Sequence, residues 1–219
     1  GASNDNNGSK EAPVATIAKA MELAIAEGAT GQIIIAEGTY NEHDLLVAGD
    51  LNITAKGNVI IDGEKAGIIF SDRGYNLILD GLTLINGLSS SKGGALYISY
   101  GEVETGEFDE WDDPITETIY GSLIANNCNF FNNSASYGGA IALYGANADL
   151  SNCVFESNNA SYGGALSLEA RSNLTADDCD FIANNGNDGA VLYSMASNGF
   201  IMLGTLFTLS ILLLIENVT

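Results

Sequence analysis

Basic residues are scarce in this sequence. Of its 219 residues only seven are Lys or Arg, against 28 Asp or Glu, which gives a formal net charge of -21. Nucleic-acid phosphates and anionic lipid headgroups both need a basic protein surface, so the composition predicts no nucleic-acid partner. Acidity of this kind is typical of a solvated surface that repels other copies of the chain, or of one that gathers divalent cations. We therefore expect a monomeric module.

Histidine, proline and cysteine are also few, with one, two and three copies. Because His43 is the only histidine, no Ser-His or Cys-His triad and no His-based metal site can be assembled, and we predict no catalytic residues and no organic cofactor. The scarcity of proline suits a continuous hydrogen-bonded sheet, which cannot spare backbone N–H groups. The cysteines number three and show no Cys-x-x-Cys spacing, which argues against a disulfide framework or a zinc site.

The chain does contain a sequence motif that occurs twice, 25 residues apart. It runs from Cys128 to Ile141 and returns from Cys153 to Leu166, and a weaker third copy begins at Cys179. Self-similarity at a fixed period indicates one structural unit that stacks on its own copies. The repeated positions are Cys128, Cys153 and Cys179; Phe130, Phe155 and Phe181; Asn133, Asn158 and Asn184; and the pairs Gly138, Gly139 and Gly163, Gly164.

A unit of this length with glycine-rich corners and no helical pattern predicts one coil of a parallel β-helix, an all-β solenoid whose coils stack about 4.8 Å apart. Equivalent side chains should then form columns along the axis. We expect the cysteines and the phenylalanines to form two apolar columns. The asparagines should form a third, in which side-chain amides hydrogen-bond from coil to coil.

The domain organisation follows from the same pattern. Residues 1–12 are polar and predict a flexible lead-in, and 13–198 predict the β-helix domain. An apolar stripe within Pro13–Glu27 predicts a helix that covers the open end of the stack. The apolar segment 199–219 holds an uncharged run over 199–215. This run has three possible interpretations: a membrane anchor, terminal coils of the stack, or an artefact of a fragment. Membrane contact is expected only through this run.

An acidic insertion interrupts the repeat at residues 100–121, and we expect it to form a loop. It contains no Lys or Arg, and it holds the only tryptophan of the chain. Carboxylates are hard oxygen ligands, so Asp109, Asp112 and Asp113 are candidate calcium ligands. The aromatic residues Trp111, Tyr100 and Tyr120 are candidate contacts to a sugar ring or a protein partner. The alternative is a solvated insertion that binds nothing.

Two motifs carry a family resemblance. The Phe-x-x-Asn pattern at 130–133, 155–158 and 181–184, with Gly-Gly-Ala-Ile/Leu at 93–96, 138–141 and 163–166, resembles the polymorphic outer membrane protein repeat. Over residues 5–193 the chain resembles archaeal adhesin-like surface proteins with right-handed parallel β-helix domains. The resemblance implies a right-handed parallel β-helix of the pectin-lyase-like superfamily. It also implies an extracellular, non-enzymatic module at the cell surface that displays loops to a glycan or protein.

The same fold also carries polysaccharide lyases and glycoside hydrolases, so a polysaccharide-active enzyme is the main alternative. A passive structural spacer of the cell envelope is a third. Asn-x-Ser/Thr triplets would be glycosylation acceptors in an exported protein. The predicted acceptors are Asn52, Asn132, Asn159 and Asn173.

Overall fold

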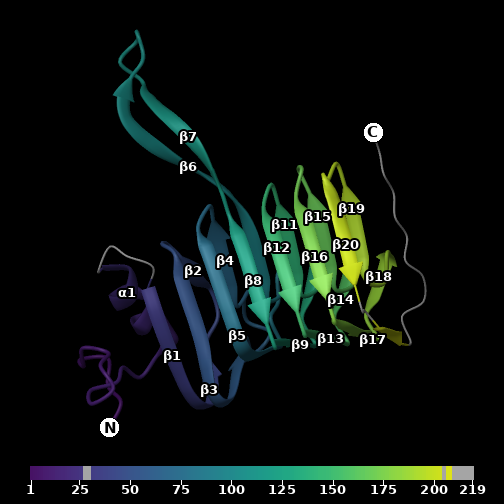
Figure 1. The fold of residues 1–219 in the computed structure, drawn as a ribbon, viewed down its shortest axis with the longest axis horizontal. Helices are drawn as coiled ribbons and strands as arrows, with labels where there is room; N and C mark the ends of the chain where they lie inside the picture. The colour runs from purple at the N-terminus through teal and green to yellow at the C-terminus, as the bar shows by residue number, and fades with distance from the viewer. Residues whose placement is uncertain (27–30, 204–205, 209–219) are drawn as a thin grey trace.

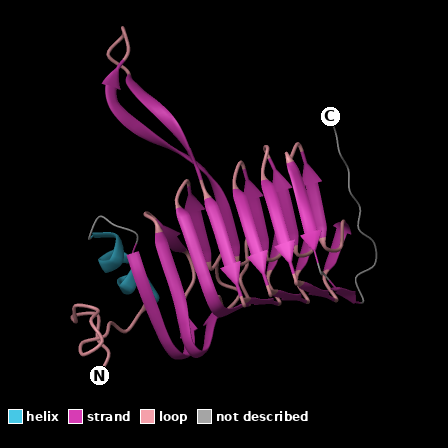
Figure 2. Cartoon of the chain, viewed as in Figure 1, coloured by secondary structure: helices cyan, strands magenta, loops and turns pink. Residues whose placement is uncertain are grey.

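A computed structural model of the chain describes residues 1–26, 31–203 and 206–208, and its body is a parallel β-helix (Figure 1). Successive coils lie side by side, and their strands pair in parallel. Within the described residues a single strand pair, β6 with β7, is antiparallel. The predicted all-β solenoid is therefore confirmed, and Figure 2 shows a stack of strands joined by loops, with the helix at one end.

The strands form three sheets along the stack. Sheet 1 contains β1 (Gly31–Asn41), β3 (Leu51–Asp62), β5 (Asn76–Ile85), β8 (Ser122–Asn126), β9 (Asn129–Phe131), β12 (Asn147–Ser151), β13 (Val154–Glu156), β16 (Asn173–Asp177), β17 (Asp180–Ile182), β20 (Gly199–Leu203) and β21 (Leu206–Thr208). Sheet 2 contains β2 (Leu45–Val47), β4 (Phe70–Arg73), β6 (Leu96–Phe108), β11 (Ile141–Tyr144), β15 (Leu166–Glu169) and β19 (Leu192–Met195), with β7 (Pro114–Tyr120) beside β6. Sheet 3 contains β10 (Ser134–Tyr137), β14 (Asn159–Tyr162) and β18 (Asn185–Asp188).

The helix α1 (Ile17–Ala26) packs against β1 at the N-terminal end of the stack (Figure 1). Its first turn is capped from both sides, because Thr16 Oγ1 accepts the Lys19 amide at 3.2 Å and the Glu42 carboxylate accepts the Ile17 amide at 2.7 Å. Ile17 and Met21 are buried. The helix begins later than the predicted Pro13, and its predicted last residue Glu27 lies outside the described residues. Residues 1–12 contain no helix or strand.

The repeated residues lie in columns inside the coils. Phe155 lies between Phe130 and Phe181, with ring centroids 4.8 Å apart on each side and nearly parallel planes. Cys128, Cys153 and Cys179 are free and buried. These apolar columns supply the continuous core that each coil could not form alone, because every coil needs its neighbours to cover it.

The asparagine column hydrogen-bonds along the axis. Asn158 Oδ1 accepts the Asn133 amide at 3.0 Å, and Asn158 Nδ2 donates to the Phe130 carbonyl at 2.8 Å. Asn184 Oδ1 accepts the Asn158 amide in the same way at 3.0 Å. Each buried side-chain amide thus has partners in the adjacent coils, which a buried polar group requires.

The Gly-Gly pairs turn the chain from sheet 3 into sheet 2. Gly138 and Gly163 have φ values of 60° and 66°, in the left-handed region that glycine tolerates. A Cβ on Gly138 would lie 2.1 Å from the Ile141 carbonyl oxygen, and a Cβ on Gly139 would lie 2.1 Å from the Gly164 carbonyl oxygen. Any side chain here would collide with backbone, so the repeat requires glycine at both positions.

The apolar C-terminal segment is described only in part. The strands β20 and β21 extend sheet 1 by pairing in parallel with β16 and β17. The rest of 199–219 lies outside the described residues. Among the residues that are described, no helix is both long and apolar enough to cross a membrane.

Candidate functional site

The acidic insertion forms a hairpin that projects from the side of the stack (Figure 1). Its strands β6 and β7 pair in antiparallel register from Tyr100↔Tyr120 to Phe108↔Pro114. The expected loop is therefore an ordered ribbon. The segment that forms β7 is rich in β-branched Thr and Ile, which favour a strand, and this signal was available in the sequence.

The hairpin tip is organised by its own hydrogen bonds. Asp109 Oδ1 accepts the amides of Trp111 at 2.8 Å and Asp113 at 3.0 Å, as an aspartate does in a tight turn. Across the described part of the chain, no three His, Cys, Asp or Glu side chains are grouped to hold a metal ion. The calcium ligands predicted at Asp109, Asp112 and Asp113 therefore stay a sequence prediction. The Trp111 side chain is 74% exposed.

Two hollows flank the base of the hairpin. The larger, of about 630 Å³, is called the tyrosine hollow here, and the residues that define its chemistry are Arg73, Tyr75, Tyr97, Tyr100, Glu102 and Tyr144. The smaller, of about 470 Å³, is called the turn hollow. It is lined by Tyr100, Glu102, Thr118 and Tyr120 and by turns of later coils that carry Arg171, Asn173 and Asn198. The tyrosine hollow has the size of a small-ligand pocket and an aromatic lining.

The hollows bring together only part of the predicted contact set. Tyr100 lines both hollows and Tyr120 lines the turn hollow, while Trp111 lies at the tip of the hairpin and lines neither. The tyrosines missed by sequence reasoning are Tyr75, Tyr97 and Tyr144. A signal for Tyr97 existed, because it follows the repeated Gly-Gly-Ala-Leu phrase directly and shares this phase with Tyr193.

Sheet register explains how these tyrosines reach one surface. Tyr97 is in register with Ser71 and Ala142 on the outer face of sheet 2, and Tyr144 is in register with Ser99. The Tyr144 ring lies 5.7 Å from the Tyr100 ring at the hairpin base. Burial raises the pKa of Tyr97 above its ordinary value of 10.0, so its hydroxyl stays a hydrogen-bond donor in neutral solution.

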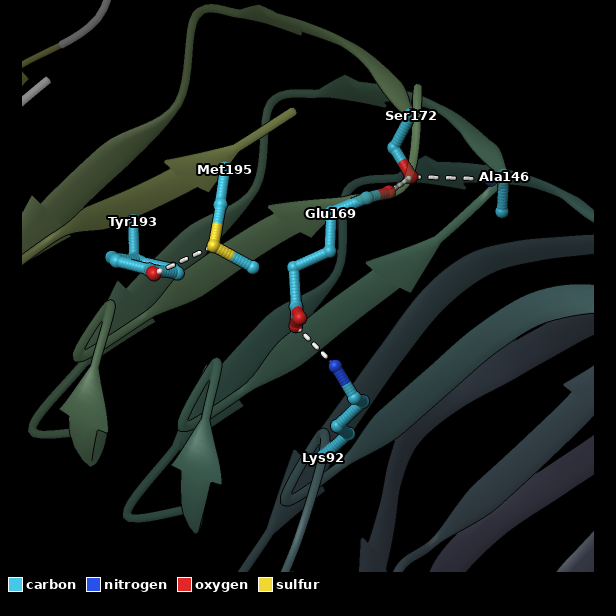
Figure 3. Close-up of polar contacts among 6 residues, drawn as sticks. All are labelled: Lys92, Ala146, Glu169, Ser172, Tyr193 and Met195. Carbon is cyan, nitrogen blue, oxygen red and sulfur yellow. Dashed lines mark hydrogen bonds and ion pairs between the residues drawn. The ribbon is translucent and has the colours of Figure 1, made fainter. Parts of the chain in front are cut away.

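Beside the tyrosine hollow, Lys92 forms an ion pair with Glu169 across two coils (Figure 3). The Glu169 side chain is 7% exposed, and the ammonium group of Lys92 lies 4.9 Å and 4.7 Å from the ring centroids of Tyr137 and Tyr144. A buried carboxylate needs such a partner. In the same coil, Ser172 Oγ donates to the Glu169 carbonyl at 2.6 Å and so holds the following turn. Lys92 is therefore engaged within the protein.

Five of the seven Lys and Arg side chains form no ion pair in the described residues, and two of these five, both arginines, line the hollows. Arg73 lines the tyrosine hollow and Arg171 lines the turn hollow. In the part of the chain that the structure describes, the ion pairs of Lys and Arg side chains are Lys19 with Glu22 and Lys92 with Glu169. His43 contacts Asp44, as expected for a loop residue outside either hollow. On a strongly acidic surface, each hollow thus presents one guanidinium group to solvent or ligand.

A buried carboxyl group lies under the hairpin base. Asp72 is fully buried; its Oδ1 accepts the Tyr75 amide at 3.0 Å, and its Oδ2 has no hydrogen-bond partner. Burial raises the pKa of Asp72 from 3.8 to about 7. A Cβ on Gly121, where the chain re-enters the coil, would lie 2.5 Å from Asp72 Oδ2. Sequence periodicity gave no signal for this residue.

The predicted glycosylation acceptors lie at or near the surface. Asn132, Asn159 and Asn173 are exposed, whereas Asn52 is half-buried in β3. Asn173 Nδ2 donates to Asn147 Oδ1 at 2.8 Å at the edge of the turn hollow. A glycan on Asn173 would cover that hollow.

Comparison with known families supports the architecture. A family model described as "Right handed beta helix region" matches residues 44–207. The match covers both hollows and the hairpin, and it begins after α1 and β1. Neither the curated proteins nor the solved structures gave a match.

Proposed function

The chain belongs to the right-handed β-helix family, and from that premise we propose that it is a non-enzymatic extracellular module that binds a glycan in the tyrosine hollow. The fold itself serves both enzymes and adhesins, so the proposal depends on the site. The observation that carries it is the set of four tyrosines around a hollow of about 630 Å³, with the unpaired Arg73 among them.

This lining has the chemistry that a sugar ring needs. Aromatic faces pack against the apolar C–H faces of a pyranose, and tyrosine hydroxyls remain available to hydrogen-bond at the rim. Arg73 can donate hydrogen bonds to the hydroxyl groups of the sugar, and Glu102 can accept hydrogen bonds from them. Because most of the tyrosines stand on sheet strands rather than on a free loop, the surface is held in place before the ligand arrives.

Binding is favoured over catalysis by what the hollow offers. Glycoside hydrolysis uses two carboxyl groups that flank the scissile bond. The lining of the tyrosine hollow includes one carboxylate, Glu102, and the nearby Lys92 is engaged by Glu169. The arrangement therefore supports a binding module, adhesin-like in role, rather than a lyase or hydrolase.

The test is a glycan array probed with the full chain, followed by titration of the sugars that bind. Tyr97→Ala should weaken binding about two- to tenfold, because one stacked ring contributes roughly 0.5–1.5 kcal/mol. Tyr40→Ala is the matched control, because Tyr40 lies in β1 away from the hollow. No binding to any glycan, or equal binding by Tyr97→Ala, would contradict the proposal. Release of shorter sugars from a bound polysaccharide would instead make the protein an enzyme.

A further inference from the structure

The hairpin formed by β6 and β7 exposes far more apolar surface than its size requires. Of the eleven large hydrophobic side chains that are exposed in the described residues, six lie on the hairpin. Tyr100 and Tyr120 lie at its base beside the hollows. Val103, Phe108, Trp111 and Ile115 lie farther out, within residues 103–117, the distal hairpin. A ribbon whose only role was to stay solvated would not gather such residues, and exposed apolar groups collected in one place mark an interaction surface.

Val103, Ile115 and Ile119 share one face of the ribbon, whereas the paired Tyr100 and Tyr120 lie on the opposite face. Alternate residues of a strand point to the same side, so Ile115, Glu117 and Ile119 lie on one face of β7. The pairing Val103↔Glu117 adds Val103 to that face, which is therefore apolar with one carboxylate. Ile119 packs over Gly74 on the body, since a Cβ on Gly74 would lie 2.5 Å from Ile119 Cγ1. Val103 and Ile115, beyond this anchor, are left 46% and 38% exposed.

Both outer edges of the ribbon are open. Sheet 2 pairs with β6 only as far as Ser99, and within the described residues β7 pairs with β6 alone. A two-stranded hairpin without further cover is marginally stable in water. Its free edges are templates for another strand, which would contribute main-chain hydrogen bonds and cover the apolar face.

The charge on the ribbon determines which strand can bind. Residues 100–121 carry eight carboxylates and no Lys or Arg. The eight are Glu102, Glu104, Glu107, Asp109, Glu110, Asp112, Asp113 and Glu117. A second copy of this chain, at a net charge of -21, is repelled, and so is any acidic strand. A strand that alternates basic with apolar residues is attracted and steered.

We propose that the distal hairpin, residues 103–117, is a docking arm that accepts a β-strand from a basic protein partner. The apolar residues of that strand cover Val103 and Ile115, its basic residues meet the carboxylates, and its backbone pairs with a free edge. The proposal does not depend on the tyrosine hollow, because the edge and the face lie farther out along the ribbon. The acidic charge favours basic partners and also disfavours pairing between two copies of this chain.

The experiment titrates the full chain with a short peptide of alternating Lys and Val at low salt. Trp111 is the only tryptophan, so its emission reports binding at the hairpin tip. We expect saturable binding that changes this emission. A Glu–Val peptide should not bind. A Lys–Val peptide that is N-methylated at alternate residues keeps its charge but cannot pair with an edge, and it should bind at least about tenfold more weakly.

Variants separate docking from general attraction to an acidic protein. The triple change Glu104→Gln, Glu107→Gln and Glu117→Gln should weaken binding about tenfold, since each exposed ion pair contributes a fraction of a kcal/mol. Its control removes the same charge from the body at exposed Asp149, Glu156 and Asp177 and should leave binding unchanged. Both variants are expected to keep the melting temperature of the parent.

Several outcomes would overturn the proposal. Failure of the Lys–Val peptide to bind would end it directly. Equal binding of the N-methylated peptide, or equal weakening by the body triple, would mean that only charge attraction operates. Self-association lost on Val103→Lys, measured by sedimentation, would assign the arm to a second copy. Loss of glycan binding in the tyrosine hollow would leave this inference intact, because Tyr97→Ala does not touch residues 103–117.

Discussion

Phe155 and Phe108 place the same side chain in two opposite environments. Phe155 is fully buried between two rings whose centroids are each 4.8 Å away, whereas Phe108 is 60% exposed near the hairpin tip. In the body, the inward-facing Phe, Cys and Asn positions of the repeat have copies in neighbouring coils that supply matching shape and hydrogen bonds. In the hairpin, no neighbouring coil supplies such a copy. Periodic stacking thus provides stability, and departure from the period leaves surface available for binding.

The largest expected difference comes from truncating these two residues. Phe155→Ala should lower the free energy of unfolding by about 3–5 kcal/mol, because it removes a buried ring from the middle of a continuous column. Phe108→Ala should change it by less than about 0.5 kcal/mol, as exposed substitutions do. Denaturant unfolding of both variants measures this directly. Similar losses in the two would mean that the hairpin tip is packed in solution.

A smaller effect, set by pH, is expected from Asp72 at the junction of body and hairpin. Because its folded pKa is about 7 and its ordinary value 3.8, the folded state holds a proton that the unfolded state has lost between these values. Stability from this group is complete below pH 3.8 and is lost as pH rises through 7. The free energy of unfolding of Asp72→Asn, relative to that of the parent, should therefore increase as pH rises, by up to about 4 kcal/mol at pH 8.

The measurement is the difference in unfolding free energy between Asp72→Asn and the parent at several pH values from 4 to 8. Titration of the exposed carboxylates is common to both proteins and cancels in this difference. Asp62→Asn serves as a control, because Asp62 is only half-buried at the surface end of β3. A flat difference for Asp72→Asn would show that its carboxyl group ionises freely in the folded protein.

The smallest expected effect separates buried from exposed asparagine pairs. Asn158→Ala should cost about 1–3 kcal/mol, because the Asn133 amide and the Phe130 carbonyl each lose a buried partner. Asn147→Ala removes the exposed pair with Asn173 and should cost less than about 0.5 kcal/mol. Thermal unfolding of both compares them. Equal costs would mean that water satisfies the inner column as readily as the outer one.

Much of the structure of the body could be predicted from the sequence because its geometry is repetitive. Once Cys128, Phe130 and Asn133 recur at a fixed spacing, stacking places each above its copy, and the burial of one predicts the burial of all. The glycine pairs are dictated equally locally, since backbone of the next coil leaves no room for a side chain. The capping helix was also predicted, although its first residue was not, because the cap from Glu42 comes from beyond β1.

Only part of the candidate site could be predicted from the sequence. The composition of 100–121 pointed to Tyr100 and Tyr120, yet the hairpin form and its separation of Trp111 from the hollows depend on strand pairing. Calcium binding there remains a prediction from composition. Asp72 gave no signal, because an isolated aspartate after a short strand reads as a turn residue, and burial under Gly121 appears only when the coils close.

The sequence by itself determined the solenoid, its columns, its corners and its acidic character, because each of these follows from spacing and composition along the chain. Tertiary structure alone decided which outward-facing residues meet. Lys92 and Glu169 lie 77 positions apart and two coils apart, and Tyr75, Tyr97 and Tyr144 belong to successive coils. Outer-face positions are not held to the repeat by packing, so their residue types vary freely, and only the register of sheet 2 shows which of them share a surface.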